Sequence, residues 1–314
     1  MRWGHRLRVL VLGFCVLFGV EGCVGPQTEQ ILSSRGALPA SVEIDSVPFF
    51  PQEQYFCGPA SLAMALAWSG LPVMPDDLVA EVYTPGREGS FAPDIVTAAR
   101  RNGRVAIETN ELDDLLRELA AGHPAIVFQN LRLSVFPQWH FAVAIGYDLN
   151  ARQLILRSGT NRRQLMPLDT FENTWRRADY WALVVLPPDV APATADTASW
   201  LAAAAGLERA SRPQEAQIAY ETFLSRWPGN RSAQMGRANA LFALNRFEGA
   251  EQAYKEVVAG DPLMAEAWNN LAYALYRQGK RDEAVRAAMR AVAIAGERNA
   301  DYADTLREVS QPVQ

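Results

Sequence analysis

The chain contains little cysteine and little histidine. Only three of its 314 residues are cysteine and only three are histidine. Metal centres are usually built from clusters of these two residue types, and none is seen in the sequence. A phosphate-binding G-x-x-x-x-G-K-[ST] loop is missing as well. We therefore expect no metal and no cofactor.

Basic blocks and long apolar runs are also scarce. The formal net charge is −5 and no long basic block occurs, so nucleic acid is not an expected partner. An apolar stretch, "VLVLGFCVLFGV" at 9–20, is too short to span a bilayer comfortably and has the length of a signal-peptide core. With 49% apolar and 21% charged residues, the chain has an ordinary globular composition and room for roughly two domains of about 150 residues each.

The first 24 residues indicate export. Three arginines precede the apolar stretch: Arg2, Arg6 and Arg8. The "VEGC" that follows it resembles the lipobox of bacterial lipoproteins, although Glu21 departs from the usual pattern. The resemblance implies that residues 1–22 are a signal peptide and that Cys23 is lipidated. Val24 stands where an Asp would favour inner-membrane retention, so we expect an outer-membrane lipoprotein facing the periplasm; an uncleaved anchor or an ordinary signal peptide is the alternative.

Cys57 is the one cysteine left without a partner. Cys15 lies in the apolar stretch and Cys23 would carry lipid, so Cys57 cannot form an internal disulfide in the exported protein. It stands in "QEQYFCGPASLAMAL" (52–66), where an apolar helical pattern begins. At a helix N-terminus, unpaired N–H groups and the helix dipole favour thiolate over thiol. The alternative is a small buried core residue.

Two histidines remain after the signal peptide. His123 lies between a helical pattern and an apolar strand, where we expect a surface connection. His140 opens the apolar strand "HFAVAIGYD". A histidine at the mouth of a strand can face a helix N-terminus, as a thiolate–imidazolium pair requires. We expect such a pair to lower the pKa of Cys57 below its ordinary value of about 8.5.

Four segments together resemble the C39-like branch of the papain-type cysteine peptidases: "VPFFPQEQYFCGPASLAMAL", "DIVTAARRNG", "LRELAAGHPAIVFQN" and "HFAVAIGYD". The resemblance covers about residues 42–187 and implies a papain-like α+β fold. It further implies that Cys57 is the nucleophile and that His140 is the general base and then the acid. Gln52 would donate to the oxyanion hole beside the backbone N–H of Cys57, and Gln54 competes with Gln52 for that role.

The third catalytic position departs from the family. C39-like enzymes usually place an Asp or Asn on the strand after the histidine, whereas this chain reads "QLILRSGTNRRQL". Ser158 stands 18 residues after His140, near the expected place, and Asn161 and Asp148 are the alternatives. A weaker orienting group should lower the rate more than abolish the chemistry. This departure is also the best argument for an inactive, peptide-binding relative.

The C-terminal part repeats every 34 residues. The equally spaced positions are Ala216, Ala250 and Ala284; Pro228 and Pro262; Tyr220 and Tyr254; and Ala204, Ala238 and Ala272. The pattern resembles three tetratricopeptide repeats followed by a capping helix, "NADYADTLREV", with Gly296 in place of the third proline. This resemblance implies an all-α solenoid whose concave face binds a protein partner.

These patterns predict five segments: a signal peptide (1–22), a tether (23–41), a C39-like peptidase domain (42–187), a linker (188–198) and a tetratricopeptide-repeat domain (199–314). The predicted function is a cysteine peptidase that cleaves peptide bonds in a peptide or protein substrate and is held to the membrane by a lipid anchor. A catalytically inactive papain-fold scaffold that binds peptides is the alternative.

The anchor can be tested by substitution of Cys23. Cys23→Ala should move the protein from the membrane fraction into the soluble periplasm, because the acceptor of the lipid is lost while the folded part is untouched. Fractionation and mass spectrometry of the 23–314 chain measure the effect. An unsubstituted chain without the mass of a lipid would contradict the lipoprotein interpretation.

Overall fold

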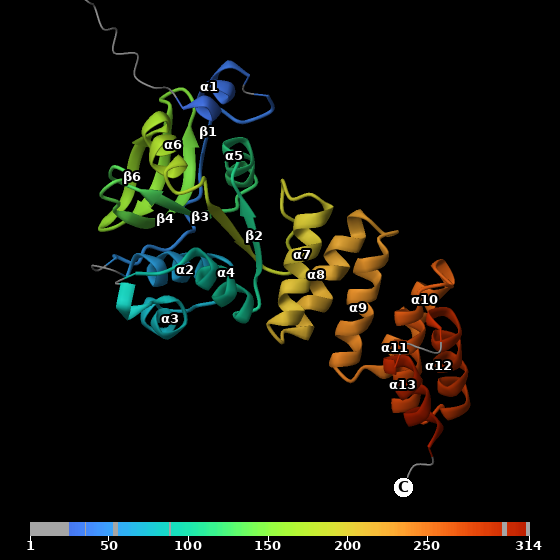
Figure 1. Ribbon diagram of the computed structural model, residues 1–314. Coiled ribbons are helices and arrows are strands. Elements are labelled where there is room, and N and C mark those ends of the chain that lie inside the picture. Colours follow the sequence, from blue (N-terminus) through green and yellow to red (C-terminus); the bar gives the residue numbers. More distant parts are fainter. Residues whose placement is uncertain (1–24, 35, 53–55, 88, 297–299, 312–314) are drawn as a thin grey trace, which may run out of the picture.

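The computed structural model describes residues 25–311 except 35, 53–55, 88 and 297–299. Its N-terminal part is built on a seven-stranded antiparallel sheet (Figure 1). The strands are β1 (Ser41–Glu43), β2 (Val105–Thr109), β3 (Ala125–Asn130), β4 (Trp139–Asp148), β5 (Gln153–Ser158), β6 (Asn161–Pro167) and β7 (Ala182–Leu186). Their order is β2-β7-β3-β4-β5-β6, and β1 pairs with the far end of β4.

Gly146 makes room for β1 beside β4. In the register of this pair, Val42 lies opposite Tyr147 and Glu43 opposite Gly146. A Cβ atom at position 146 would come within 2.1 Å of the Val42 carbonyl oxygen, so a side chain there would push β1 away. The glycine of "HFAVAIGYD" therefore serves strand pairing, at the end of β4 opposite His140.

Helices cover the sheet. They are α1 (Pro26–Ser33), α2 (Cys57–Trp68), α3 (Pro75–Val82), α4 (Ala92–Arg101), α5 (Leu112–Ala120) and α6 (Leu168–Arg176), with a short 3-10 turn at Pro85–Arg87. The middle of α2 is buried on all sides because "GPASLAMAL" is small or apolar throughout. This helix packs against β3 and β4, whereas α1 lies against α5 and α6 (Figure 1).

The expected tether is largely folded onto the domain. Within it, the backbone N–H groups of Gln27 and Thr28 donate to the buried carboxylate of Glu172 on α6, at 3.0 and 2.7 Å. A carboxylate at a helix N-terminus satisfies N–H groups that have no partner within the helix. Ile31 is buried in the core. The segment described from Gly25 onwards is therefore held by hydrogen bonds and apolar packing that its polar composition did not indicate.

The expected linker is also fixed in place. Thr194 donates from both its backbone N–H and its hydroxyl to Glu118 Oε1, each at 2.8 Å, and Glu118 Oε2 lies 2.6 Å from His123 Nδ1. Burial raises the pKa of Glu118, but the hydrogen bonds from His123 and Thr194 outweigh burial and the pKa is lowered. His123 is therefore a buried partner of Glu118 and does not occupy the surface position that we expected.

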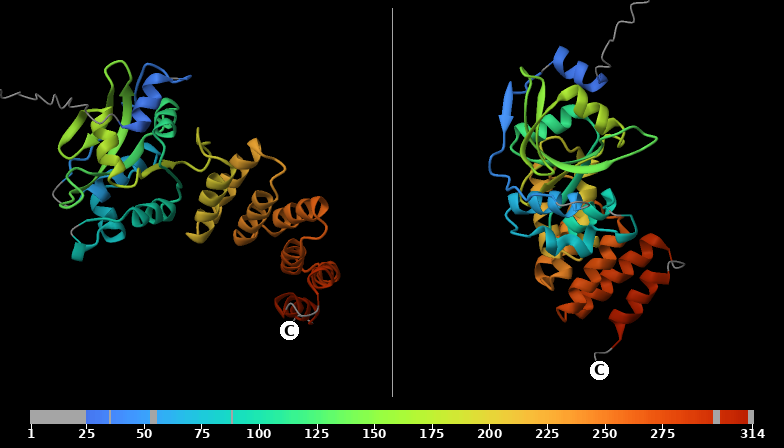
Figure 2. Two further views of the ribbon diagram at one scale, coloured as in Figure 1. Left: turned by 45° about the horizontal axis from the view of Figure 1, so that its top comes forward. Right: turned by 90° about the vertical axis from the view of Figure 1, so that its left-hand side faces the viewer.

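Seven helices form the C-terminal solenoid in the described residues. They are α7 (Thr197–Arg209), α8 (Pro213–Arg226), α9 (Arg231–Ala243), α10 (Phe247–Gly260), α11 (Ala265–Arg277), α12 (Arg281–Ala295) and α13 (Ala300–Ser310). The alanines of the 34-residue pattern are all fully buried between the paired helices. This arrangement confirms the predicted fold class, an α+β domain followed by an all-α repeat domain (Figure 2).

The first repeat shares its core with the sheet. Helix α7 packs on β2, and Trp200 of α7 is fully buried in the same apolar cluster as the sheet residues. Arg212, at the start of α8, donates to the carbonyl of Arg101 at the end of α4. The two parts of the chain are therefore joined by a packed interface as well as by the connecting peptide.

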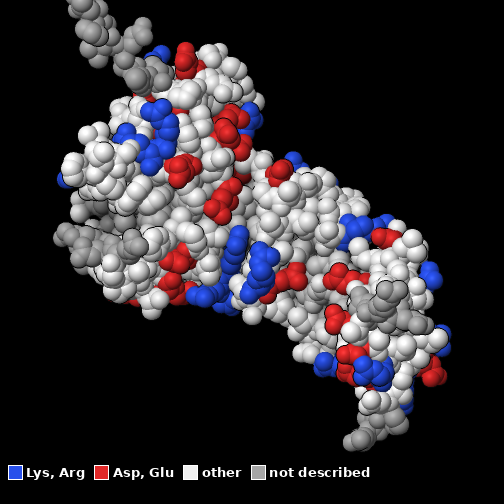
Figure 3. All heavy atoms as spheres, in the orientation of Figure 1, with Lys and Arg blue, Asp and Glu red and all other residues white. Residues whose placement is uncertain are grey.

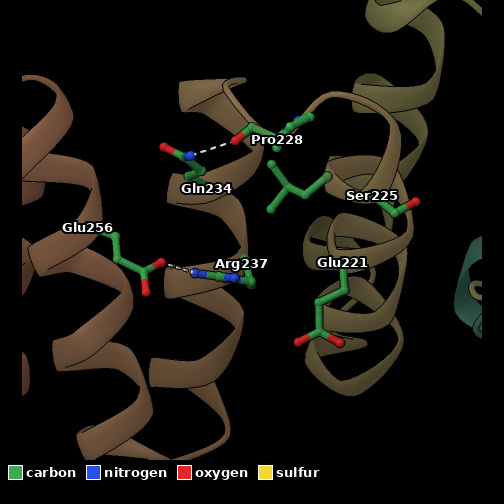
Figure 4. Close-up of a pocket in the computed structure, with 7 residues that line it drawn as sticks. Glu221, Ser225, Pro228, Gln234, Arg237 and Glu256 are labelled. Carbon is green, nitrogen blue, oxygen red and sulfur yellow. Dashed lines mark hydrogen bonds and ion pairs between the residues drawn. The ribbon is translucent and has the colours of Figure 1, made fainter.

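A pocket of about 470 Å³ lies between the first two repeats (Figure 4). It is lined by Glu221, Leu224, Ser225, Pro228, Gln234, Arg237 and Glu256. The 34-residue register puts Gln234 and Arg237 where the next repeat has Trp268 and Leu271. Gln234 Nε2 donates to Pro228 O at 2.7 Å, as Trp268 Nε1 donates to Pro262 O at 3.1 Å. Gln234 thus reproduces the hydrogen bond of Trp268 without the volume of an indole ring.

Filling this pocket should stabilise the solenoid. Gln234→Trp keeps a donor for Pro228 O and adds apolar contact with Leu224, so we expect the free energy of unfolding to rise by about 1 kcal/mol. Denaturant titration of the full chain measures the change. Gln252→Trp, at an exposed position on α10, is the control and should give no comparable gain. Equal effects of the two substitutions would show that the pocket does not limit stability.

Candidate active site

Cys57 is the first residue of the buried helix α2. Phe56, which precedes it, makes no side-chain capping bond, so the first N–H groups of α2 have no side-chain cap. Pro59 is tolerated in this first turn because its missing N–H would have no partner within the helix. At Gly58 a Cβ atom would come within 2.2 Å of Ser90 Oγ. The Cys-Gly-Pro order therefore permits a close-packed helix start with backbone donors beside the thiol.

Gln52 ties this helix to the strands. Its backbone N–H donates to Gly159 O at 3.0 Å, and its Oε1 accepts from Gly159 N at 2.9 Å. Its Nε2 donates to Ser61 Oγ on α2 and to Phe141 O on β4, both at 3.3 Å. The amide is buried and is fully engaged inside the protein. To act as an oxyanion donor, Gln52 would have to give up one of the two long Nε2 bonds.

His140 is the second residue of β4 and is held by Ser158. Its Nε2 lies 2.8 Å from Ser158 Oγ at the end of β5. In the sheet, Gln129 of β3 lies directly opposite His140. Because Nε2 is engaged with Ser158, Nδ1 is the ring nitrogen that this bond leaves unused. A serine hydroxyl can both donate and accept, so it orients the ring without enforcing one tautomer as a carboxylate would.

Burial governs the ionisation of both groups. It raises the pKa of Cys57, and hydrogen bonds with the backbone groups of Phe141, Gly58 and Cys57 itself oppose this without reversing it. Burial also lowers the pKa of His140 to about 4. The resting pair at neutral pH is therefore a thiol and a neutral imidazole. Our expectation of a lowered thiol pKa was wrong, because a neutral imidazole supplies no positive charge to stabilise a thiolate.

The structure brings four of the expected site residues into one network. Cys57 contacts the backbone of Phe141, the residue after His140, while Gln52 binds Phe141 and the turn after Ser158. The alternatives for the third position are elsewhere or make other contacts. Asp148 is eight residues further along β4, about 26 Å away at strand spacing, and accepts the N–H groups of its own turn. Asn161 lies opposite Ser158 in the register of β5 and β6, at an exposed position.

Two expected site residues lie outside the described residues. These are Cys23, the expected lipidation site, and Gln54, the competitor of Gln52. Ser61 and Gly159 were missed by sequence reasoning, although both bind Gln52. Ser61 could have been found by its position one helical turn after Cys57, which places the two on one side of α2. The glycine of "SGT" indicated a turn but gave no sign that the turn binds Gln52.

Other kinds of site were sought in the same residues. Among the described residues no group of three or more His, Cys, Asp or Glu side chains could hold a metal ion. In the same part of the chain, none of the helices combines the length and the apolar character needed to cross a bilayer.

Comparisons with known proteins give matches for both parts of the chain. Residues 44–183 match the Peptidase_C39 like family, and residues 201–262 and 237–300 match the tetratricopeptide repeat. A protein from Bacillus anthracis described as a C39-like peptidase matches 47% of this chain and 98% of its own, at 19% identity and a TM-score of 0.42. A double-glycine motif protease from an AMS/PCAT transporter, solved with its leader peptide, matches 46% and 93%, at 22% identity and a TM-score of 0.35.

For the solenoid, the first tetratricopeptide domain of Spaghetti (RPAP3), bound to an HSP90 peptide, matches 36% of this chain and 88% of its own, at 23% identity and a TM-score of 0.34. Among curated proteins, none matches the chain.

Substitution of Ser158 tests how His140 is oriented. Ser158→Ala removes the bond to Nε2, and we expect peptide cleavage to fall about tenfold or more because the ring is no longer held. Ser158→Asp should raise the pKa of His140 and fix its hydrogen on Nε2, which moves the acid limb of the pH–rate profile upward. Asn161→Ala is the control. Unchanged rates and profiles in both Ser158 variants would exclude an orienting role.

Proposed function

We propose that this chain, which carries a Peptidase C39-like domain followed by tetratricopeptide repeats, is a cysteine peptidase. The observation that carries the proposal is the placement of Cys57 at the uncapped start of α2, against the strand whose His140 is fixed by Ser158. A thiol, a base held in one orientation and backbone N–H groups at a helix start are the parts that acyl transfer needs.

In the proposed reaction, the proton leaves Cys57 as the thiol attacks. The sulfur bonds to the carbonyl carbon of the peptide while Nδ1 of His140 takes the thiol proton, and the carbonyl electrons move onto oxygen. The backbone N–H of Cys57 faces that oxyanion. His140 then gives its proton to the leaving amine as the C–N bond breaks. Water, deprotonated by His140, then attacks the thioester carbon. As the C–S bond breaks, His140 returns its proton to the sulfur, and the released carboxylic acid ionises in solution.

This route differs from one that begins with an ion pair. Since burial keeps both groups neutral, proton transfer accompanies attack in place of preceding it. Ser158 is then a positioning residue. Its hydroxyl accepts from Nε2 in the tautomer that leaves Nδ1 free to take the proton. Unlike a carboxylate, it adds no negative charge to stabilise the imidazolium.

A peptide-binding scaffold without catalysis is the second candidate. Two observations favour it. The raised pKa of Cys57 keeps the nucleophile in its less reactive thiol form, and the Nε2 of Gln52 is already engaged by internal hydrogen bonds and is not free to bind an oxyanion. For either candidate, we propose that Cys23 anchors the chain in the outer membrane, facing the periplasm, and that the concave face of the repeats binds a protein partner. The "VEGC" motif and the repeat match support these two assignments.

Digestion of a peptide library decides between the two. The unsubstituted mature chain should cleave peptides, and Cys57→Ala should abolish cleavage while peptide binding persists. The rate should be nearly constant from about pH 5 to 8 and fall as the pH drops through about 4, because protonated His140 cannot accept the thiol proton. Product masses and initial rates are the measurements.

Labelling of Cys57 provides a check that needs no substrate. Iodoacetamide should react slowly at pH 6 and faster only at alkaline pH, because the thiol has a raised pKa. Asn161→Ala, at an exposed position beside the network, is the matched control for both assays and should behave as the unsubstituted chain does. Peptide binding without cleavage by the unsubstituted chain would contradict the peptidase proposal and leave the scaffold.

A further inference from the structure

Among the described residues, exposed large hydrophobic side chains gather in the loop between β3 and β4. Charges of both signs are interspersed over the face in Figure 3 and mark no partner there. By contrast, five of the ten exposed large hydrophobic side chains in the described residues lie within residues 131–139, here named the apolar hairpin. Leu133, Val135 and Phe136 at its tip are 69%, 74% and 76% exposed, and Trp139 is 52% exposed. Clusters of this kind mark interaction surfaces.

Hydrogen bonds within the loop hold the tip in shape. The buried Asn130 accepts with its Oδ1 from the N–H groups of Arg132 and Gln138, at 3.1 and 3.0 Å. Phe136 N donates to Leu133 O at 3.0 Å. Several peptide donors of the loop are therefore satisfied internally, which lowers the cost of moving the tip out of water. The apolar side chains are displayed from a closed turn.

The charges around the hairpin suit an anionic surface. The sequence has no Asp or Glu from residue 119 to residue 147. Arg132 lies on the hairpin itself, and Arg177 donates from Nε and Nη2 to Asn130 O at its base, at 3.2 and 3.0 Å. Apolar tips flanked by arginine and tryptophan match the chemistry of a lipid interface, where indole rings lie at the headgroup level.

The start of the described chain lies near the base of the hairpin. Gly25 packs against Glu172 of α6, and a Cβ atom there would overlap the Glu172 carboxylate. Arg177, five residues further on, holds the hairpin base, and five residues of helix rise about 7.5 Å. Cys23 precedes Gly25 by two residues, which span at most about 7 Å. A lipid on Cys23 would therefore hold this side of the domain at the bilayer.

We propose that the apolar hairpin inserts Leu133, Val135 and Phe136 into the lipid bilayer surface, with Trp139 at the headgroups. The occupant is the bilayer because the tip is highly exposed and flanked by arginine and tryptophan, whereas pockets for small ligands are concave. If the chain is a peptidase, as proposed above, the insertion also defines where its substrates lie. Because His140 follows Trp139 directly, insertion places the catalytic pair at the membrane surface, and the substrates would be peptide segments that lie there.

Vesicle sedimentation tests the insertion without the anchor. The mature chain with Cys23→Ser is mixed with vesicles of phosphatidylethanolamine and phosphatidylglycerol. We expect it to bind, and the added double substitution Leu133→Ser/Phe136→Ser should weaken binding at least about tenfold, because two apolar side chains leave the hydrocarbon. Leu263→Ser is the matched control, since Leu263 is 70% exposed on the solenoid. It should bind as the parent does.

Each other outcome contradicts the proposal. Equal binding by the double variant and the Leu263 control would exclude insertion by the hairpin, and so would failure of the parent to bind vesicles. If the double variant bound vesicles as the parent does but cleaved soluble peptides more slowly, the hairpin would be a substrate-docking surface. If the parent formed a dimer and did not bind vesicles, and only the double variant lost the dimer, the hairpin would be a self-association surface. Cys57→Ala should bind vesicles normally, so failure of the peptidase proposal is seen separately.

Discussion

The candidate site depends on the contacts of a single side chain, the amide of Gln52. It binds α2 through Ser61, β4 through Phe141 and the β5–β6 turn through Gly159. These elements carry Cys57, His140 and Ser158, respectively, and they are brought together from three distant parts of the sequence. Loss of activity on substitution of Gln52 would therefore not by itself assign it to the oxyanion hole, because the same change would loosen the positions of the nucleophile and the base.

Much of the fold follows from local patterns in the sequence. The apolar run after Cys57 has the length of a helix and is rich in helix-forming alanine, leucine and methionine. The segment "HFAVAIGYD" forms a central strand because its residues can be buried on both faces. The alanines at 34-residue spacing form the close contacts between paired helices that the repeat predicts. Cys57 and His140 could be named for the same reason, since each stands at the end of an element whose type the sequence indicates, whereas Ser158 was named only through the resemblance to the C39-like family.

Other properties depend on contacts between distant segments, which no local pattern records. Glu172 fixes the start of α1, and Glu118 fixes both Thr194 and His123, so two segments that looked like a tether and a linker are packed. The charge state of the pair could not be predicted either. A helix N-terminus favours a thiolate, but the extent to which Cys57 and His140 lose water is a property of the assembled fold, and here burial outweighs the helix.

The exposed hairpin and the half-buried His140 meet at the first residues of β4. Along Trp139, His140 and Phe141, alternate side chains of a strand point to opposite faces, and exposure falls steeply from the loop into the sheet. Trp139 stacks on Phe128 with ring centroids 5.2 Å apart, and Phe128 stacks on buried Phe141 at 4.4 Å. A partner that covers Trp139 would therefore act, through one continuous aromatic stack, on the strand that holds His140.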